Sequence, residues 1–259
     1  LIIGLVSLLL ISCEQQNTTP RDSDKLSVYT SFYAIYDFVG KIGGDKIELI
    51  NLVPPGTEPH SWEPSAKDMI GLEHADLFFY NGLGLESFAD KISNSLNNGE
   101  IAFVELSEKI VSNNEMVVFS QNHEHDDEEH GQEEHSHGEF DPHVWLSPKL
   151  ALKQMEVIKN TLVERDPENE DYYKANFDKV EKKIYELDEQ YKEAVEGFKS
   201  RTIIVSHEAY GYLCREYDLE QIGINGLNSG DDVSPSVMSE IVDYINQNNV
   251  KYIFFDSST

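Results

Sequence analysis

From Lys25 onward, short apolar runs alternate with amphipathic segments. The apolar runs are rich in β-branched and aromatic residues, so they predict strands at 26–31, 45–53, 76–82, 101–106, 201–206, 219–225 and 250–256. Segments with helical spacing lie between them, at 33–43, 66–75, 85–96, 208–217 and 234–248. This alternation is typical of βα units, so we predict an α/β fold with parallel sheets.

A longer helix is predicted over 166–199, with Asp166 as its N-cap and Pro167 at its first position. Roughly eight turns of it carry the apolar positions and correspond to a rod of roughly 45 Å. Apolar residues form one narrow stripe along it, at 173, 177, 180, 184, 187, 191, 194 and 198. The same spacing fits a dimeric coiled coil. We favour a lone helix in a monomer, because globular segments stand on both sides of it.

This helix divides the chain into an N-terminal lobe, 26–165, and a C-terminal lobe, 200–259. The last predicted strand, 250–256, has no helix after it. A buried parallel strand needs cover on both faces, so we expect the C-terminal lobe to be incomplete.

The first 13 residues form an apolar run that ends at Cys13 and is typical of a signal peptide. The letters Leu10-Ile11-Ser12-Cys13 resemble a bacterial lipobox, which would make Cys13 the lipidated first residue of the mature chain. An ordinary secretory signal is the alternative. Residues 14–25 are polar and would form a tether. We therefore expect an extracytoplasmic protein anchored to a bacterial membrane, either periplasmic or at the cell surface.

The other cysteine, Cys214, lies at a helical core position. We interpret it as a core residue rather than a reactive thiol. If Cys13 carries lipid, no intrachain disulfide can form.

The chain of 259 residues carries 48 acidic and 20 basic residues, which gives a net charge of −28. Such a surface repels nucleic acid and anionic lipid headgroups, so the charge argues against both as partners. It attracts cations, although acidity of this kind can also serve solubility alone.

Histidines gather within 123–145, which holds six of the nine in the chain. The part from 121 to 139 has no hydrophobic periodicity, so we expect a mobile loop. Its histidines alternate with carboxylates and would bind Zn²⁺ weakly: His123, His125, His130, His135 and His137. Metal capture by this loop is one hypothesis, and a solvated acidic loop with incidental affinity is the other.

Three histidines outside the loop are candidates for a fixed metal site. His60 and His207 follow predicted strands, where ligand sites of α/β folds lie, and His143 precedes a helix between two prolines. Asp256 stands at the end of the last predicted strand. Three imidazoles and a carboxylate suit tetrahedral Zn²⁺. His74 lies on a predicted helix, and we interpret it as a surface or core residue.

Four ordered motifs resemble one known family. "VPPGTEPHSWEPSAKDMIGLEHADLFFYNG", "DPHVWLSP", "VSHEAYGYL" and "YIFFDSS" are similar to motifs of the zinc/manganese solute-binding lipoproteins of bacterial ABC transporters. The likeness runs from about Lys25 to the last residue. It is strongest to the zinc branch (ZnuA/AdcA), in which an acid- and histidine-rich loop also precedes the second ligand.

The resemblance implies two α/β lobes joined by one long helix, with the metal in the cleft between them. His60 and His143 would bind the metal from the N-terminal lobe, and His207 and Asp256 from the C-terminal lobe. Zinc members carry histidine at the position of His207, whereas manganese members tend to carry a carboxylate there. Zinc members often have Glu where this chain has Asp256, so the fourth ligand could be water-mediated.

The function that follows is a non-enzymatic carrier that captures Zn²⁺ and delivers it to an ABC permease. A Mn²⁺ carrier on the same fold is the nearest rival. A secreted zinc hydrolase is a weaker one, because the chain has no H-E-x-x-H motif and only Glu63 and Glu208 could serve as its general base. Adhesion to host surfaces has been attached to this family, and no residue here bears on it.

Overall fold

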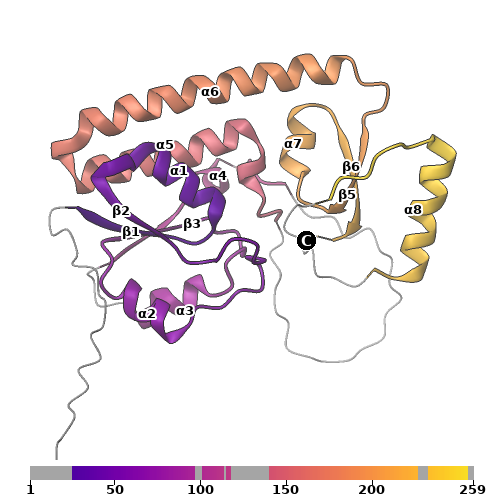
Figure 1. Ribbon diagram of the computed structural model, residues 1–259. Coiled ribbons are helices and arrows are strands. Elements are labelled where there is room, and N and C mark those ends of the chain that lie inside the picture. Colours follow the sequence, from indigo (N-terminus) through magenta and orange to yellow (C-terminus); the bar gives the residue numbers. More distant parts are fainter. Residues whose placement is uncertain (1–24, 97–100, 114, 118–139, 227–232, 256–259) are drawn as a thin grey trace, which may run out of the picture.

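The computed structural model describes residues 25–96, 101–113, 115–117, 140–226 and 233–255. Its first lobe is built on a parallel sheet with the strand order β2-β1-β3-β4 (Figure 1). The strands are β1 (Leu26–Thr30), β2 (Ile47–Asn51), β3 (Leu77–Tyr80) and β4 (Ala102–Glu105). Val28 of β1 pairs with Leu49 on one side and Leu77 on the other. All four carboxyl ends therefore point to the same edge of the sheet.

Helices cover both faces of this sheet (Figure 1). One face carries α1 (Tyr33–Gly43) and α5 (Pro148–Arg165), and the other carries α2 (Ala66–Leu72) and α3 (Ala89–Ser95). The short α4 (Glu108–Ser112) follows β4. Single turns of 3-10 helix lie at η1 (Gly44–Lys46) and η2 (Val144–Leu146). The sheet is thus buried on both sides, which is why β3 is an almost continuous apolar run.

Local sequence signals define where these helices begin. Ser65 and Asp68 form a capping box at the start of α2. At α5, Ser147 accepts a hydrogen bond from the backbone N–H of Leu150, and Pro148 takes the first position. The sequence indicated a helix after His143 but not that it would extend over 18 residues.

The long helix α6 (Glu170–Glu196) runs from the first lobe to the second (Figure 1). The prediction that it begins at Asp166 was wrong, because a 3-10 turn, η3 (Pro167–Asn169), comes first. The Asp166 carboxylate accepts hydrogen bonds from the Tyr173 hydroxyl at 2.6 Å and from Asn169 Nδ2 at 2.7 Å. Its side chain therefore anchors the first turns of α6 and caps no backbone N–H of that helix.

The apolar stripe of α6 changes direction along the helix. Tyr173, Phe177 and Val180 are buried against the first lobe, whereas Leu187 is 39% exposed. Burial resumes further along at Asp188 and Val195. A strict four-and-three spacing drifts around a straight helix, so the second half buries a different set of positions. In this chain α6 packs on α1 and α5, as expected for a lone helix.

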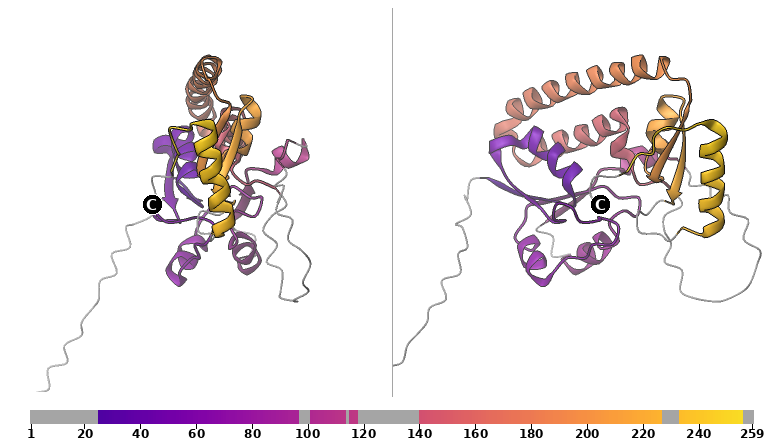
Figure 2. Two further views of the ribbon diagram at one scale, coloured as in Figure 1. Left: turned by 90° about the vertical axis from the view of Figure 1, so that its right-hand side faces the viewer. Right: turned by 45° about the vertical axis from the view of Figure 1, so that its right-hand side comes forward.

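The second lobe contains two parallel strands, β5 (Thr202–His207) and β6 (Glu220–Asn225). Helix α7 (Gly211–Glu216) lies between this sheet and the first lobe (Figure 1). Helix α8 (Pro235–Asn248) lies on the far side of the sheet, in yellow in the right panel of Figure 2. The α/β fold with two lobes is confirmed. No helix in the described ranges is both long and apolar enough to cross a membrane.

The strand predicted at 250–256 was wrong over its described part, 250–255. Phe254 forms one isolated bridge with Val205, supported by backbone hydrogen bonds to Ser206 and Ile204. Tyr252 and Phe255 are 77% and 67% exposed. β-branched and aromatic composition favours a strand only where the side chains pack on neighbours, and here the pairing stops at one residue.

The two lobes share buried apolar contacts through α7. Tyr212 is 1% exposed and clusters with Ile110, Val144 and Leu150 of the first lobe. On the other side of α7, Leu213 and the following Tyr217 pack against Val195 of α6. Helix α7 is therefore held by the first lobe and by the end of α6 at once.

Because the apolar stripe drifts around α6, substitutions in its first and second halves should lower the free energy of unfolding by different amounts. Phe177→Ala removes a buried ring and should lower the free energy of unfolding by about 3–5 kcal/mol. Leu187→Ala removes a partly exposed side chain and should cost no more than about 1 kcal/mol. Urea unfolding of the full chain measures both. A dimeric coiled coil along the whole stripe would instead make the two substitutions similarly costly.

Candidate metal centre

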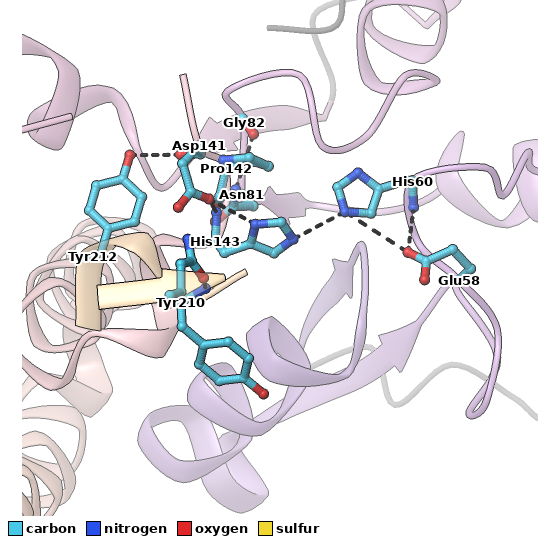
Figure 3. Close-up of polar contacts among 10 residues, drawn as sticks. Glu58, His60, Asn81, Gly82, Asp141, Pro142, His143, Tyr210 and Tyr212 are labelled. Atoms are coloured by element: carbon cyan, nitrogen blue, oxygen red, sulfur yellow. Dashed lines mark hydrogen bonds and ion pairs between the residues drawn. The ribbon is translucent and has the colours of Figure 1, made fainter. Parts of the chain in front are cut away.

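His143 occupies a buried turn, Asp141-Pro142-His143, just before η2. One carboxylate oxygen of Asp141 accepts two hydrogen bonds from His143, from the backbone N–H at 2.9 Å and from the ring Nδ1 at 2.8 Å (Figure 3). Both side chains are 3% exposed. A neutral ring that donates from Nδ1 keeps its lone pair on Nε2. The carboxylate thereby makes Nε2 the atom that can bind a metal.

The same turn is held from the other side by Asn81, at the end of β3. The Asn81 Nδ2 donates to the carbonyl of Pro142 at 2.9 Å, and its Oδ1 accepts from Gln154 at 2.9 Å. The backbone N–H groups of Asn81 and Gly82 donate to the two oxygens of Glu86, at 2.8 and 3.0 Å. Burial raises the pKa of Glu86. This network gives a physical reason for the "YNG" motif.

His60 lies in the loop between β2 and α2 and meets His143. The two Nε2 atoms are 3.2 Å apart, and the ring centroids are 5.2 Å apart (Figure 3). Ligands about 2.0–2.1 Å from one tetrahedral Zn²⁺ lie roughly 3.3–3.4 Å from each other. The spacing of these nitrogens is therefore close to that of two ligands of a single zinc ion.

A carboxylate that sequence analysis missed lies beside His60. Glu58 Oε1 is 4.0 Å from His60 Nε2 and accepts a hydrogen bond from the His60 backbone N–H at 3.3 Å. It could lend negative charge, or an oxygen ligand, to a cation at this point. The motif "TEPH" places it two residues before the histidine.

His207 is the last residue of β5 and enters from the second lobe. It is 8% exposed, and its ring centroid is 5.3 Å from that of His143, with 65° between the ring planes. The structure therefore brings the three predicted histidines together. Across the described residues, no three His, Cys, Asp or Glu side chains are already arranged to hold a metal ion. His60 and His143 have the required spacing, and His207 stands beside them without completing the set.

Two aromatic side chains lie on one side of His143. The Trp145 ring lies 5.2 Å from that of His143, and Phe32 packs edge-on against Trp145 at 4.7 Å. Charges interact more strongly where water is excluded, so Asp141 exerts more influence here than it would at the surface.

The remaining predicted residues fall into two groups. Cys13, Asp256 and the five loop histidines lie outside the described residues, so their roles stay predictions. His74 is exposed, in agreement with the surface alternative, but it lies in the turn after α2 and not on a helix as predicted. Glu63, which the hydrolase hypothesis would need, is exposed and forms an ion pair with Lys91 at 2.9 Å.

The fold and the three histidines define a two-lobed α/β binding protein whose candidate ligands come from both lobes. Residues 28–259 match the family described as "Zinc-uptake complex component A periplasmic" (ZnuA). The chain belongs to this family, whose members are solute-binding components of transport systems outside the cytoplasmic membrane.

Curated relatives agree with this assignment. The high-affinity zinc uptake system protein ZnuA of Bacillus subtilis is 36% identical, over 98% of this chain and 79% of that protein. The zinc-binding lipoprotein AdcA of Streptococcus pneumoniae is 32% identical over 100% of this chain, which spans only 50% of that longer protein.

Solved structures show the same architecture. AdcAII of S. pneumoniae superposes with a TM-score of 0.77 at 28% identity, covering 91% of this chain and 81% of the other. The Zn(II)-bound ZnuA-like domain of S. pneumoniae AdcA gives a TM-score of 0.72 at 29% identity, covering 91% and 80%.

Cys214, in α7, is 5% exposed, so it is a core residue as predicted. Burial, followed by the negative charge of Asp141, raises the pKa of its thiol from 9.0 to about 12. The thiolate is the reactive form.

Alkylation of the native chain at Cys214 should therefore be slow at pH 8 and should rise about tenfold per pH unit up to pH 10. In urea the rate should level off once the pH passes the ordinary thiol pKa. Mass analysis of the Cys214 peptide after iodoacetamide treatment measures both. Equal rates in the native and unfolded chains would show an accessible, reactive thiol.

Proposed function

We propose that this chain captures Zn²⁺ outside the cytoplasmic membrane and delivers it to the permease of an ABC uptake system. The observation that carries the proposal is the meeting of His60, His143 and His207 from two lobes. Imidazole nitrogens suit Zn²⁺. A carrier has to bind the ion and release it, and it does not need the open coordination position at which a catalytic zinc activates water. The family assignment and the zinc-binding relatives support the same cargo.

Zn²⁺ is favoured over Mn²⁺ by the chemistry of the donors. Mn²⁺ prefers carboxylate, carbonyl and water oxygens, whereas imidazole suits zinc. Three of the four proposed ligands are histidines. Asp256 is our proposal for the fourth, with Glu58 or a water molecule as the other sources of oxygen.

The anchoring of the carrier follows from its N-terminal residues. We propose that Cys13 carries lipid and that the protein works as a monomer beside its permease. The lipobox-like letters 10–13 and the lipoprotein relative from S. pneumoniae support the anchor. Several acyl groups on one cysteine hold a protein at a membrane stably.

A competitive zinc titration of the metal-stripped chain tests the proposal. The wild-type chain should have one tight Zn²⁺ site with a clear preference over Mn²⁺. His207→Ala should weaken that site by more than about 100-fold, since loss of an outer-shell partner alone costs 10–100-fold. The matched control is His74→Ala, which removes an exposed histidine and should leave the affinity unchanged. Weak binding that is indifferent to His207 would contradict the proposal.

We also propose that the five loop histidines capture zinc weakly and pass it to the fixed site. Deletion of 123–137 should leave the tight site intact and remove only weak, heterogeneous binding. Uptake by cells should fall under zinc starvation and recover when zinc is plentiful. If uptake under starvation is unchanged by the deletion, the loop is a solvated acidic segment with incidental affinity.

A further inference from the structure

The support of His143 includes atoms from both lobes. One Asp141 oxygen holds His143, and the second, Oδ2, faces Gly211 at the start of α7. A Cβ added to Gly211 would lie 2.5 Å from Asp141 Oδ2, closer than any such contact tolerates. The α7 backbone is therefore in direct contact with the carboxylate that orients a ligand of the first lobe.

A second contact joins the same two segments. The hydroxyl of Tyr212, the next residue of α7, donates to the backbone carbonyl of Asp141 at 2.6 Å (Figure 3). Tyr212 is 1% exposed, and burial raises the pKa of its hydroxyl to about 12, so it stays a protonated donor. Gly211 and Tyr212 thus hold the side chain and the backbone of Asp141 together.

Helix α7 is fixed to the first lobe along its whole length. Arg215 donates to the backbone carbonyls of Glu115 at 2.6 Å and Met116 at 3.1 Å. Glu216 accepts from the Ser147 hydroxyl at 2.6 Å and forms an ion pair with Lys149. By chain order α7 belongs to the second lobe, but most of its polar contacts are with the first.

The segment 207–212 therefore serves both sides of the metal centre. It begins with His207, and four residues later it enters α7 at Gly211. The backbone N–H of Tyr210 donates to Gln221 Oε1 of β6 at 2.9 Å, which fixes the segment to the second sheet. One short stretch thus carries the candidate ligand of the second lobe and contacts the group that orients a ligand of the first.

We propose that Asp141 is a positioning residue for His143 and that Gly211 and Tyr212 control it from the second lobe. Displacement of the start of α7 then changes His207 and the orientation of His143 together, so both lobes lose their hold on zinc in one step. The part of this inference that concerns zinc release rests on the proposed zinc function. The contact between α7 and Asp141 is independent of that function.

Gly211→Ala tests the coupling without altering a histidine or a carboxylate. Its methyl group should displace Asp141 Oδ2 and weaken the tight zinc site by about 10–100-fold, the range found when outer-shell partners are lost. Gly197→Ala is the matched control, because its added Cβ would meet only the Ala194 carbonyl at an ordinary 3.6 Å. That variant should bind zinc as the wild type does.

Two further readouts separate positioning from general destabilisation. In the metal-free chain, ¹⁵N NMR of the imidazoles should show His143 protonated at Nδ1 in the wild type, and Gly211→Ala should shift this signal. In an Asp141→Ala background, Gly211→Ala should have no further effect on zinc affinity, because the two changes act through one contact. If Gly211→Ala does not fold, Tyr212→Phe removes the other contact without adding volume and should give a smaller change in the same direction.

Wild-type affinity and NMR signals in Gly211→Ala would overturn the inference, as would an equal loss of affinity with and without Asp141. A wild-type chain that lacks a tight zinc site would count against the proposed function instead. The NMR comparison needs no metal, so it decides the positioning role in that case too.

Discussion

The buried turn Asp141-Pro142-His143 is the structural constraint on which the metal centre depends. Its backbone carbonyls accept hydrogen bonds from Asn81, directly after β3, and from Tyr212 of the second lobe. Gln154 of α5 holds Asn81 in turn. A buried carboxylate is costly unless its oxygens are paired, and here the pairing is with the histidine that it orients. The polar groups that specify this turn therefore also fix which nitrogen faces the partner histidine. The same contacts therefore stabilise the turn and orient His143 for metal binding.

Much of the architecture could be predicted because it follows from local periodicity. Seven apolar runs gave six strands close to the expected places, and α1 matches its predicted range. The failures occurred where composition or local capping signals alone did not decide the structure. The segment 250–255 has strong strand character, yet only Phe254 is bridged to β5. The start of α6 was misplaced because the Asp166 carboxylate binds Tyr173 and Asn169 instead of capping the backbone.

The candidate ligands could be located from sequence, but the residues that hold them in place could not. The rule that sites lie beyond the carboxyl ends of strands pointed to His60 and His207, and the place of His143 before a helix, between two prolines, added the third histidine. Asp141, Asn81 and Gly211 were missed as functional residues. Their important contacts join residues some 60–70 positions apart, such as Asn81 with Pro142 and Tyr212 with Asp141, and no periodicity predicts such pairs. The only sequence signal was their place inside the motifs.

We propose that one zinc ion is bound by histidines from both lobes. X-ray absorption at the zinc edge tests it most directly, on a chain that lacks 123–137 and carries one equivalent of zinc. Binding from both lobes predicts three imidazole nitrogens and an oxygen donor at about 2.0–2.1 Å, with no sulfur, and one imidazole fewer in His207→Ala. A site with fewer than three imidazoles in the parent chain, or one that His207→Ala leaves unchanged, would contradict it.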